Sequence, residues 1–510
     1  MIHSLKVECA FRVTVRDRFL YYSNTHHEIK PSPSTMRIPT PFCRLVSMLC
    51  MTFTLTGLSQ TLDVTGNSVD GPNYGLLMDA GSTSTKLKVY RWSKAESHKH
   101  TPTVHLVVSK RFKPGLSEFK GTEEELKTYL TNILDQAKAS VPEDKQKDSP
   151  IYLYATAGMR YFSAESATHL MSMVRSLLLN TSISPFQFSL NNAQIISGEE
   201  EGVYAWIAVN YLNGFFEHKN LPTKSAGVLE MGGGSTQIAF VPTGPLYSEE
   251  FQVRVAGVRY QLYVQSYFNF GSNGISDQVI ERLATAQPRA SKIWNPCMLT
   301  GDQKEVTLDS GRTVTLHGQG DPDRCLQELR EILKPGTGSE CQLPPCAIGS
   351  VYQPAIPSTT FYASGAFTFT PKTLGVLGED SVLDIDKLQR AAEQHCRRDL
   401  DTAVAQGVNK AYASSDCLIG LYTPTLLTLS YGFPRDANNI RVVSKIRGER
   451  IDWALGAMLL QVSSTLSPNK DEYSVVCPTT AGNTATSIFS GQSVMSVLLA
   501  SAAIVWSQLH

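Results

Sequence analysis

Hydrophobic positions along the chain form short apolar runs separated by polar and glycine-rich breaks. Two segments repeat one arrangement: residues 74–92 (YGLLMDAGSTSTKLKVYRW) and residues 226–241 (AGVLEMGGGSTQIAFV). Each contains an apolar strand, an acidic residue, a short loop of Gly, Ser or Thr, and a second apolar strand. The repeat predicts two related halves, each built on a pair of strands that flank such a loop.

The remaining periodic segments predict helices and strands in alternation, as in α/β proteins. Thr122 followed by Glu125 is a capping box, and apolar residues at helical spacing continue to Ala137. The expected elements are strands 151–155 and 193–197 and helices 122–137, 164–179, 198–214, 384–400 and 451–464. Residues 285–360 are rich in Pro, Gly and Cys, so we expect mostly loops there.

The two loops have the composition of phosphate-binding turns. Gly allows several backbone N–H groups to turn toward one anion, and Ser and Thr hydroxyls add donors. A carboxylate beside each loop, Asp79 and Glu230, suits a hydrated divalent cation that bridges phosphates. The candidate phosphate-binding residues are Ser82, Thr83, Ser84, Thr85, Gly232, Gly233, Gly234, Ser235, Thr236 and Gln237. One such turn is most often a simple hairpin, whereas two with matching flanks indicate a phosphate held between two halves.

A third turn and a glutamate cluster add catalytic chemistry. The turn ATAGMR offers the Thr156 hydroxyl and the Ala157 N–H, and Arg160 either pairs with phosphate or braces the acids. The next strand ends at three consecutive glutamates, residues 199–201. Acids in a first helical turn also interact with the helix dipole, but strand ends are a usual place for active residues in α/β sheets. Because phosphoryl transfer to water needs donors, a cation and a base, these parts indicate hydrolysis of a phosphoanhydride.

Composition narrows the class of protein. The 510 residues are enough for two domains, and 42% hydrophobic content fits a globular protein. The 46 Lys and Arg residues balance the 46 Asp and Glu residues, and no basic run is interleaved with aromatics. A nucleic-acid partner is therefore not expected.

The N-terminus carries features of an export signal. Residues 1–35 form an extension without a clear pattern, and residues 36–59 combine positive charge, an apolar stretch and small residues before Gln60. The apolar stretch is shorter than the roughly 20 residues of a spanning helix. We expect a cleaved signal peptide at 36–59, with a buried helix or a signal anchor as the alternative.

The cysteines agree with export. Six lie in the second half of the chain, at Cys297, Cys325, Cys341, Cys346, Cys396 and Cys417, and Cys477 follows. An even, clustered set in an exported protein indicates three disulfides, and sequence order suggests pairing of neighbours among the 15 possibilities. A zinc site is the rival interpretation, but no CxxC pair supports it. Asn180 begins a glycosylation sequon, Asn-Thr-Ser, which fits the same compartment.

The C-terminal tail, residues 479–510, resembles a lipid-anchor (GPI) signal. Small residues around Asn483 precede a polar spacer and a final apolar stretch at 494–506. The alternatives are a hydrophobic tail anchor or a disordered end. We expect attachment to a membrane through this tail, at the cell surface, or secretion.

Five blocks together resemble the motifs of the ecto-nucleoside triphosphate diphosphohydrolase (apyrase) family. The blocks are residues 74–92, 155–160, 196–214, 227–240 and 451–459, in the order of the family, and the resemblance covers about 73–465. It implies an α/β, actin-like (ribonuclease H-like) fold with two lobes and a central nucleotide cleft. It also implies hydrolysis of nucleoside tri- and diphosphates with Ca²⁺ or Mg²⁺.

The resemblance also implies domain boundaries and disulfides. Lobe I is expected at 60–197, with 444–478 returning to it, and lobe II at 198–443. The spacings of Cys341–Cys346 and of Cys396–Cys417 resemble disulfides of the family. The sequence gives no indication of an oligomeric state.

The family pattern assigns roles residue by residue. Glu201, directly before Gly202, resembles the catalytic base, and Ser235 and Gln237 resemble the residues that hold the attacking water. The remaining implied roles are phosphate contact for Ser82, Ser84 and Thr156, water-mediated metal binding for Asp79 and Glu230, a position near the metal for Trp453, and stacking on the base for Phe367 or Phe369. Glu230 stands where many relatives have Asp, which leaves the metal preference open.

Other classes of protein share some of these features. A sugar kinase or a chaperone ATPase has similar paired loops, but export, disulfides and the glutamates argue against both. An exopolyphosphatase-like phosphohydrolase is the nearest enzymatic alternative. A nucleotide-binding surface protein with weak or lost catalysis is the alternative from another class.

Overall fold

The computed structural model describes residues 71–93, 101–119, 122–218, 220–247, 251–336, 341–466 and 474–476. All of them belong to one of two units of the chain, Val69–His510. The predicted N-terminal extension, signal peptide and C-terminal tail lie outside the described residues, as does Cys477.

The first sheet has five strands in the order β3-β2-β1-β4-β5. Its strands are β1 (Asn73–Ala80), β2 (Thr85–Trp92), β3 (Val104–Phe112), β4 (Ile151–Ala155) and β5 (Ala193–Ile195). β1, β2 and β3 pair antiparallel, whereas β4 runs parallel to β1 and β5 parallel to β4. Because side chains alternate along a strand, Leu76 and Met78 face one side of the sheet, where they join a core with α2 (Glu123–Lys138) and α5 (Ala164–Leu179).

The second sheet has seven strands in the order β14-β13-β6-β7-β9-β8-β17. Its strands are β6 (Gly227–Met231), β7 (Ser235–Phe240), β8 (Phe251–Val255), β9 (Val258–Phe268), β13 (Phe361–Gly365), β14 (Ile440–Val442) and β17 (Ser474–Val476). β6, β7 and β9 pair antiparallel, and β13 and β14 extend the sheet in parallel beside β6.

Five strands of the second sheet reproduce the first sheet. The order β9-β7-β6-β13-β14 matches β3-β2-β1-β4-β5, and each pair has the same relative direction. The repeat seen in the sequence is therefore a repeat of structure, and the prediction of two related halves is confirmed.

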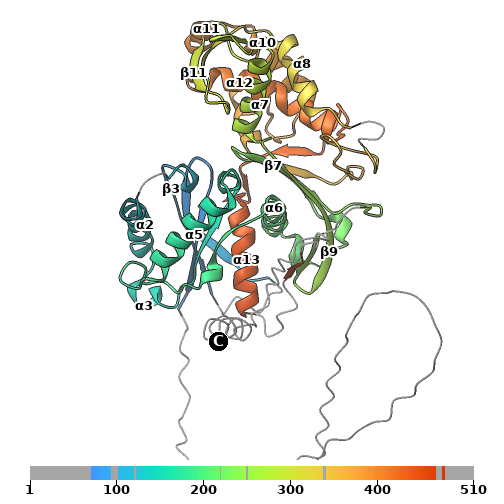
Figure 1. Ribbon diagram of the computed structural model, residues 1–510. Helices are drawn as coiled ribbons and strands as arrows, with labels where there is room; N and C mark the ends of the chain where they lie inside the picture. The colour runs from blue at the N-terminus through green and yellow to red at the C-terminus, as the bar shows by residue number, and fades with distance from the viewer. Residues whose placement is uncertain are drawn as a thin grey trace, which may run out of the picture. The chain divides into compact units, whose positions relative to one another are not determined.

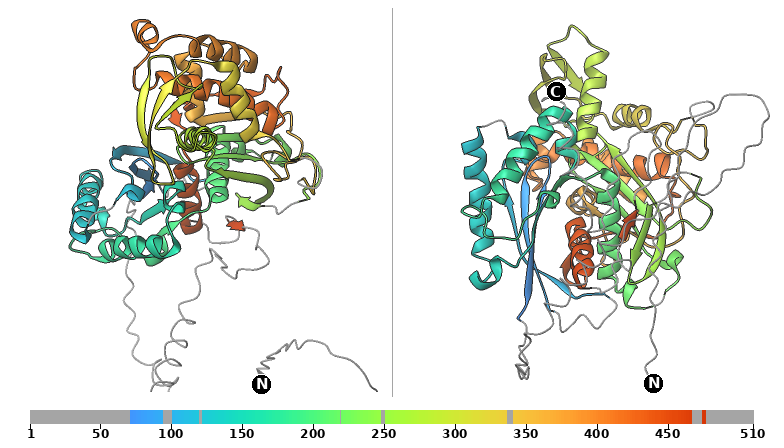
Figure 2. Two further views of the ribbon diagram at one scale, coloured as in Figure 1. Left: turned by 45° about the horizontal axis from the view of Figure 1, so that its top comes forward. Right: turned by 60° about the horizontal axis from the view of Figure 1, so that its bottom comes forward.

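Two helices lie between the sheets. α6 (Gly198–Leu212) follows the last strand of the first half but packs on β6, β7 and β9 of the second. α13 (Trp453–Leu466) follows the second half but packs on β1 and on α6. Figures 1 and 2 show α13 in red between the blue strands of the first sheet and the green strands of the second. The halves thus exchange their last helices.

The other face of the second sheet is covered by a larger helical layer (Figure 1). Its helices are α7 (Ser272–Thr285), α8 (Pro322–Leu333), α9 (Phe369–Thr373), α10 (Ile385–Cys396), α11 (Leu400–Ala405) and α12 (Ala413–Thr425). The prediction that residues 285–360 are mostly loops is wrong for part of this stretch. It contains α8 and a three-stranded sheet of β10 (Lys292–Asn295), β11 (Gln303–Thr307) and β12 (Thr313–Gly318).

Three disulfides fix this region: Cys297–Cys325, Cys341–Cys346 and Cys396–Cys417. They are the neighbour pairs that sequence order suggests. Ser474–Val476 departs from its predicted place, because we expected it in lobe I but it pairs with β8 of the second sheet. Within the described part of the chain, no helix has the length and apolar character needed to cross a membrane.

Candidate functional site

The two Gly-rich loops have the same internal geometry and meet each other. In the first loop Gly81 N donates to Ser84 O at 3.1 Å, and in the second Gly232 N donates to Ser235 O at 2.9 Å. Equivalent positions approach closely, since a Cβ on Gly233 would lie 3.0 Å from Ser82 Oγ. A side chain at this position would crowd Ser82, so glycine favours the close approach of the two loops.

Each loop is held from behind by its own half. Ser117 Oγ donates to Ser82 O at 3.3 Å. The first turn of α7 donates the N–H groups of Ser272 and Asn273 to Gly232 O and Gly233 O, each at 2.9 Å. Since these loop carbonyls are already occupied, the loops present N–H groups and hydroxyls rather than carbonyls to a ligand.

The predicted phosphate contacts do not all remain available. Ser82 and Thr83 are at least partly exposed at the loop tip, and Ser84 is buried behind it. Thr85 is the first residue of β2 and Thr236 the second residue of β7. Both are buried, and Thr236 Oγ1 already donates to Glu230 O at 2.7 Å. The third turn adjoins the second loop, because a Cβ on Gly234 would lie 2.9 Å from Ala157 Cβ. Thr156 sits at the start of that turn, and its N–H donates to Ala80 O at 3.1 Å.

The three consecutive glutamates have different environments. Glu200 completes a capping box with Ser197, in which each residue's backbone N–H donates to the other's side chain. Glu201 is buried, and its Oε2 lies 3.1 Å from Arg160 Nη2. Arg160 also donates from Nε and Nη2 to Ile196 O, at 3.3 and 3.2 Å. Arg160 thus braces Glu201, the second of the two roles open to it from the sequence.

Gln237 links Glu201 to the second loop. Its Nε2 donates to Ser235 Oγ at 2.9 Å, to Ser266 Oγ at 3.0 Å and, more weakly, to Glu201 Oε2 at 3.5 Å. Its Oε1 is a buried acceptor with no hydrogen-bond partner among the described residues. A buried acceptor in this state is suited to accept a hydrogen bond from a water or a ligand group.

Burial dominates the electrostatics of the carboxylates. Burial raises the pKa of Glu201 to about 7, although the Arg160 cation opposes the shift. The pKa of Glu230 is raised well above its usual range, first by burial and then by the charge of Glu201. Glu230 Oε2 is also buried without a partner in the described structure. A cation at this place would offset the repulsion among these carboxylates and Asp79, so the residues present fit a divalent metal.

Two of these carboxylates, Asp79 and Glu230, are the candidate metal ligands. Asp79 is 2% exposed and pairs with Lys86, whose Nζ lies 2.9 Å from Asp79 Oδ2. Within the described ranges no cluster of three or more His, Cys, Asp or Glu side chains has the arrangement of a metal cage. Two carboxylates suit a metal that keeps much of its water or binds phosphate oxygens.

The two aromatic candidates for stacking on a base differ in exposure. Phe367 is 1% exposed in the core of the second half, which leaves no free face for a base, whereas Phe369 is 68% exposed. Trp453 is buried between Tyr154 and Tyr204 at the start of α13, with ring centroids 6.5 and 6.4 Å away. Tyr161, which the sequence did not single out, is exposed beside the loops and packs on Phe268 at 4.5 Å.

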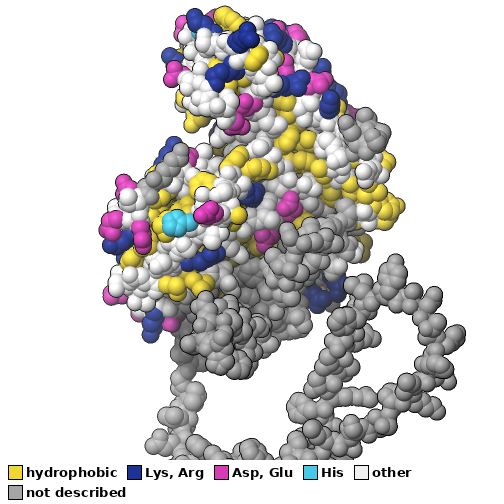
Figure 3. All heavy atoms as spheres, in the orientation of Figure 1, with side chains coloured by type: hydrophobic (Ala, Val, Ile, Leu, Met, Phe, Trp, Pro, Cys, Tyr) yellow, Lys and Arg dark blue, Asp and Glu magenta, His cyan; other side chains and the backbone are white. Residues whose placement is uncertain are grey.

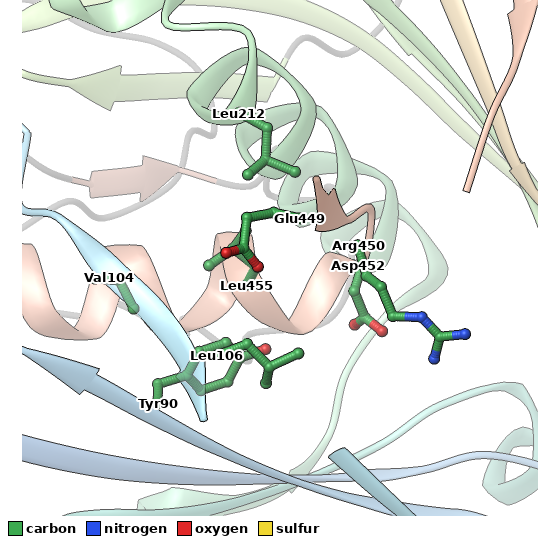
Figure 4. A pocket seen from close by; sticks show the side chains of 8 residues that line it. All are labelled: Tyr90, Val104, Leu106, Leu212, Glu449, Arg450, Asp452 and Leu455. Atoms are coloured by element: carbon green, nitrogen blue, oxygen red, sulfur yellow. The ribbon is translucent and has the colours of Figure 1, made fainter. Parts of the chain in front are cut away.

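A small pocket is lined in part by Asp452 and includes no residue of either loop. Tyr90, Val104 and Leu106 line one wall and Leu212 another, and residues 449–455 contribute Glu449, Arg450, Asp452 and Leu455 (Figure 4). The pocket is not the candidate active site. On the face seen in Figure 3 basic and acidic side chains are interspersed, as the balanced charge of the chain indicates.

Sequence reasoning missed three polar neighbours of the site: Lys86, Asp452 and Ser266. Lys86 had a usable signal, because the two strands of a hairpin place residues at equal distances from the turn opposite each other. Ser266 had none, since it lies on β9, 29 residues beyond Gln237.

Comparison with known proteins finds a family model and relatives that agree with one another. The model of the GDA1/CD39 (nucleoside phosphatase) family matches residues 67–488. The chain is 31% identical over 425 residues to ectonucleoside triphosphate diphosphohydrolase 1 of Bos taurus, which covers 76% of this chain and 80% of that protein. It is 29% identical over 427 residues to nucleoside-diphosphatase mig-23 of Caenorhabditis elegans, which covers 76% of each.

A solved structure supports the fold. Nucleoside triphosphate hydrolase from Neospora caninum aligns over 76% of this chain and 92% of that chain, with a TM-score of 0.56 and 16% identity. At that identity the likeness concerns the fold alone. Together with the two mixed sheets it confirms the predicted α/β fold class.

Proposed function

Because the chain belongs to the GDA1/CD39 (nucleoside phosphatase) family, we propose that it hydrolyses nucleoside tri- and diphosphates to monophosphates and phosphate. The observation that carries this proposal is the pair Glu201 and Gln237 beside two facing Gly-rich loops. One supplies a buried carboxylate with a pKa of about 7, and the other supplies an acceptor without a partner among the described residues. A base and an aligning acceptor beside phosphate-binding turns are what phosphoryl transfer to water requires.

The loops would hold the phosphates. Ser82 and Thr83 offer hydroxyls at the tip of the first loop, and Gly233 and Gly234 offer N–H groups in the second. Thr156 and Ala157 complete the set in the turn that adjoins Gly234. Donors from both halves would therefore converge on one phosphate chain and hold it in line with the attacking water.

Glu201 would take the proton of that water. Its pKa lies near neutral pH, where a base is both ionised and strong enough to accept a proton. The water's second hydrogen would be donated to Gln237 Oε1, which is free because Ser235 and Ser266 fix the amide through Nε2. Ser235 would act by orienting Gln237 and by contact with the water.

Asp79 and Glu230 would hold a divalent cation, through water. Members of the family depend on such a cation, and Ca²⁺ or Mg²⁺ suits an oxygen-only set of ligands. When bound, the cation neutralises charge on the phosphate oxygens. Trp453 would support this region by packing, since it is buried at the start of α13.

Phe369 is our candidate for stacking on the base. Its exposed ring is available to a ligand, whereas the buried ring of Phe367 packs in the core. An exposed aromatic ring accepts any base, because every base has a π-face.

The test is a phosphate-release panel with full-length chain, a divalent cation, and ATP, ADP, UDP, GDP and inorganic polyphosphate. We expect release from the nucleotides, and Glu201→Gln is expected to lower turnover by at least about 10²-fold while nucleotide binding persists. Glu199→Gln, in the same helical turn, is the matched control and should stay active. Full activity of Glu201→Gln would remove Glu201 as the base.

The other outcomes discriminate the alternatives. Release from polyphosphate alone would favour an exopolyphosphatase-like enzyme. Nucleotide binding without release by the unaltered chain would favour a nucleotide-binding surface protein.

For location, we propose the secretory pathway, with the cell surface or secretion as the end point. The three disulfides and the exposed Asn180 of the sequon support an oxidising compartment. Attachment through the C-terminal tail by a lipid anchor predicts release from membranes by a phosphatidylinositol-specific phospholipase. Retention after that treatment would favour a hydrophobic tail anchor.

A further inference from the structure

We propose that Lys86 is an internal counter-ion that competes with the divalent cation for Asp79 and so sets the metal affinity of the site. This inference rests on the proposed role of Asp79 and Glu230 in metal binding. It assigns to this chain a residue that tunes the site without touching the substrate.

The geometry of β1 and β2 places Lys86 at the carboxylate. The two residues are direct cross-strand partners, and Lys86 Nζ lies 2.9 Å from Asp79 Oδ2. The side chain of Asp79 is 3% exposed, whereas that of Lys86 is 34% exposed. The lysine therefore reaches the buried carboxylate from the solvent side and has a route by which to leave it.

The second half of the chain shows what is unusual about Lys86. Glu230 in β6 is opposite Gln237 in β7, as Asp79 in β1 is opposite Lys86 in β2. The equivalent position thus carries a neutral amide in one half and a cation in the other. Gln237 turns toward Ser235 and Ser266, which leaves Glu230 Oε2 without a partner among the described residues, whereas Asp79 is paired.

The neighbouring lysine does not take this role. Lys88 is 2% exposed and forms an ion pair with Asp452. Asp452 also accepts the N–H of Ala454 at 2.9 Å, which ties it to the start of α13. Lys88 is therefore a fixed structural cation, while Lys86 is the exchangeable one of the two.

Charge balance gives the consequence. Asp79 and Glu230 in their ionised forms carry two negative charges, which match a divalent cation. When the Lys86 ammonium lies against Asp79, the two ionised carboxylates and the ammonium together carry only one net negative charge. The metal must then displace the ammonium or bind more weakly beside it. The same ammonium relieves carboxylate repulsion in the metal-free protein.

The test measures binding of Mn²⁺ alone to the full chain, by electron paramagnetic resonance of the free ion. We expect Lys86→Gln to bind Mn²⁺ about fivefold more tightly, because a partly exposed ion pair no longer has to be broken. Lys110→Gln, which removes the same charge from an exposed site on β3, is the matched control and should match the unaltered chain. Equal or weaker binding by Lys86→Gln, including no binding by either chain, would overturn the proposal.

Thermal unfolding supplies a second readout. In EDTA we expect Lys86→Gln to unfold at a lower temperature than the unaltered chain. In samples with Mn²⁺ and no EDTA, we expect the unfolding midpoint of Lys86→Gln to rise by more than that of the unaltered chain. Glu230→Gln should weaken Mn²⁺ binding in both backgrounds, and if it does not, the ion binds elsewhere and the proposal fails. None of these measurements uses hydrolysis, so a failure of the proposed activity would be seen separately in the phosphate-release panel.

Discussion

Arg160→Gln is expected to move the acid limb of the pH–rate profile to higher pH. Glu201 must be ionised to accept a proton, so activity rises as pH rises through its pKa. Burial raises that pKa to about 7, and the Arg160 cation holds it from rising further. Removal of the cation therefore raises the pKa and lowers the fraction of active enzyme at neutral pH.

The size of the shift follows from the contact. Arg160 Nη2 and Glu201 Oε2 are 3.1 Å apart, with both side chains largely buried. At an effective dielectric of ~20 the attraction is about 5 kcal/mol as an upper bound. Opposite charges at this range shift a carboxyl pKa by about 1 to 3 units, and water that enters the freed space reduces the effect, so we expect about 1.5 units.

The assay is kcat/KM for ADP from pH 5 to 9 at saturating metal, with Arg160→Lys as the control. Lysine restores the charge but not the fork that binds Ile196 O, so its midpoint should lie close to that of the unaltered enzyme. All three proteins are assayed at the same saturating metal, so the comparison is of the differences between their midpoints. If both variants lose activity with unchanged midpoints, Arg160 acts by bracing the strand end and the electrostatic argument is refuted.

Two further predictions concern stability. Gly456→Ala would place a Cβ 1.9 Å from Tyr204 O where α13 crosses α6, and should lower the free energy of unfolding by about 3 kcal/mol. Gly244→Ala is the control, because its Cβ would meet nothing within 4 Å and the change should be neutral. Equal chemical-denaturation midpoints for the two variants would contradict the close approach. Replacement of Cys297 and Cys325 by Ser, which are 28 residues apart, should lower the free energy of unfolding by about 3.5 kcal/mol. Replacement of Cys341 and Cys346, which are 5 residues apart, should lower it by about 2 kcal/mol. A reversed order of the calorimetric midpoints would exclude loop length as the main term.

The sequence repeat made the pair of related sheets predictable. Asp79 and Glu230 each end an apolar strand before a Gly-rich loop, and the flanking strands recur as hairpins in equivalent places. The family motif distinguishes Glu201 from its neighbours because it directly precedes Gly202, and the structure adds that Glu200 forms a capping box with Ser197. Local patterns carry this kind of information well, because they report a hairpin, a cap or a strand end.

Other parts have no local signature. α12 is buried on every side from Asp416 to Thr425, so it lacks the apolar stripe that reveals an amphipathic helix. α8 did carry a start signal, Asp321 followed by Pro322, which the cysteine-rich surroundings obscured. The choice between Phe367 and Phe369 depends on burial in a core assembled from distant segments, which spacing cannot show.

The exchanged helices also determine when this protein becomes foldable. The inner face of the first sheet, with Leu77 and Tyr90, is covered by a core that includes α13, whose residues are made about 380 positions after those of β1. At ribosomal rates of about 5 to 20 residues per second, that face waits for some tens of seconds without its cover. The first half therefore exposes an apolar face until α13 is made, and a chain that stops before Trp453 lacks the helix that packs on β1 and α6.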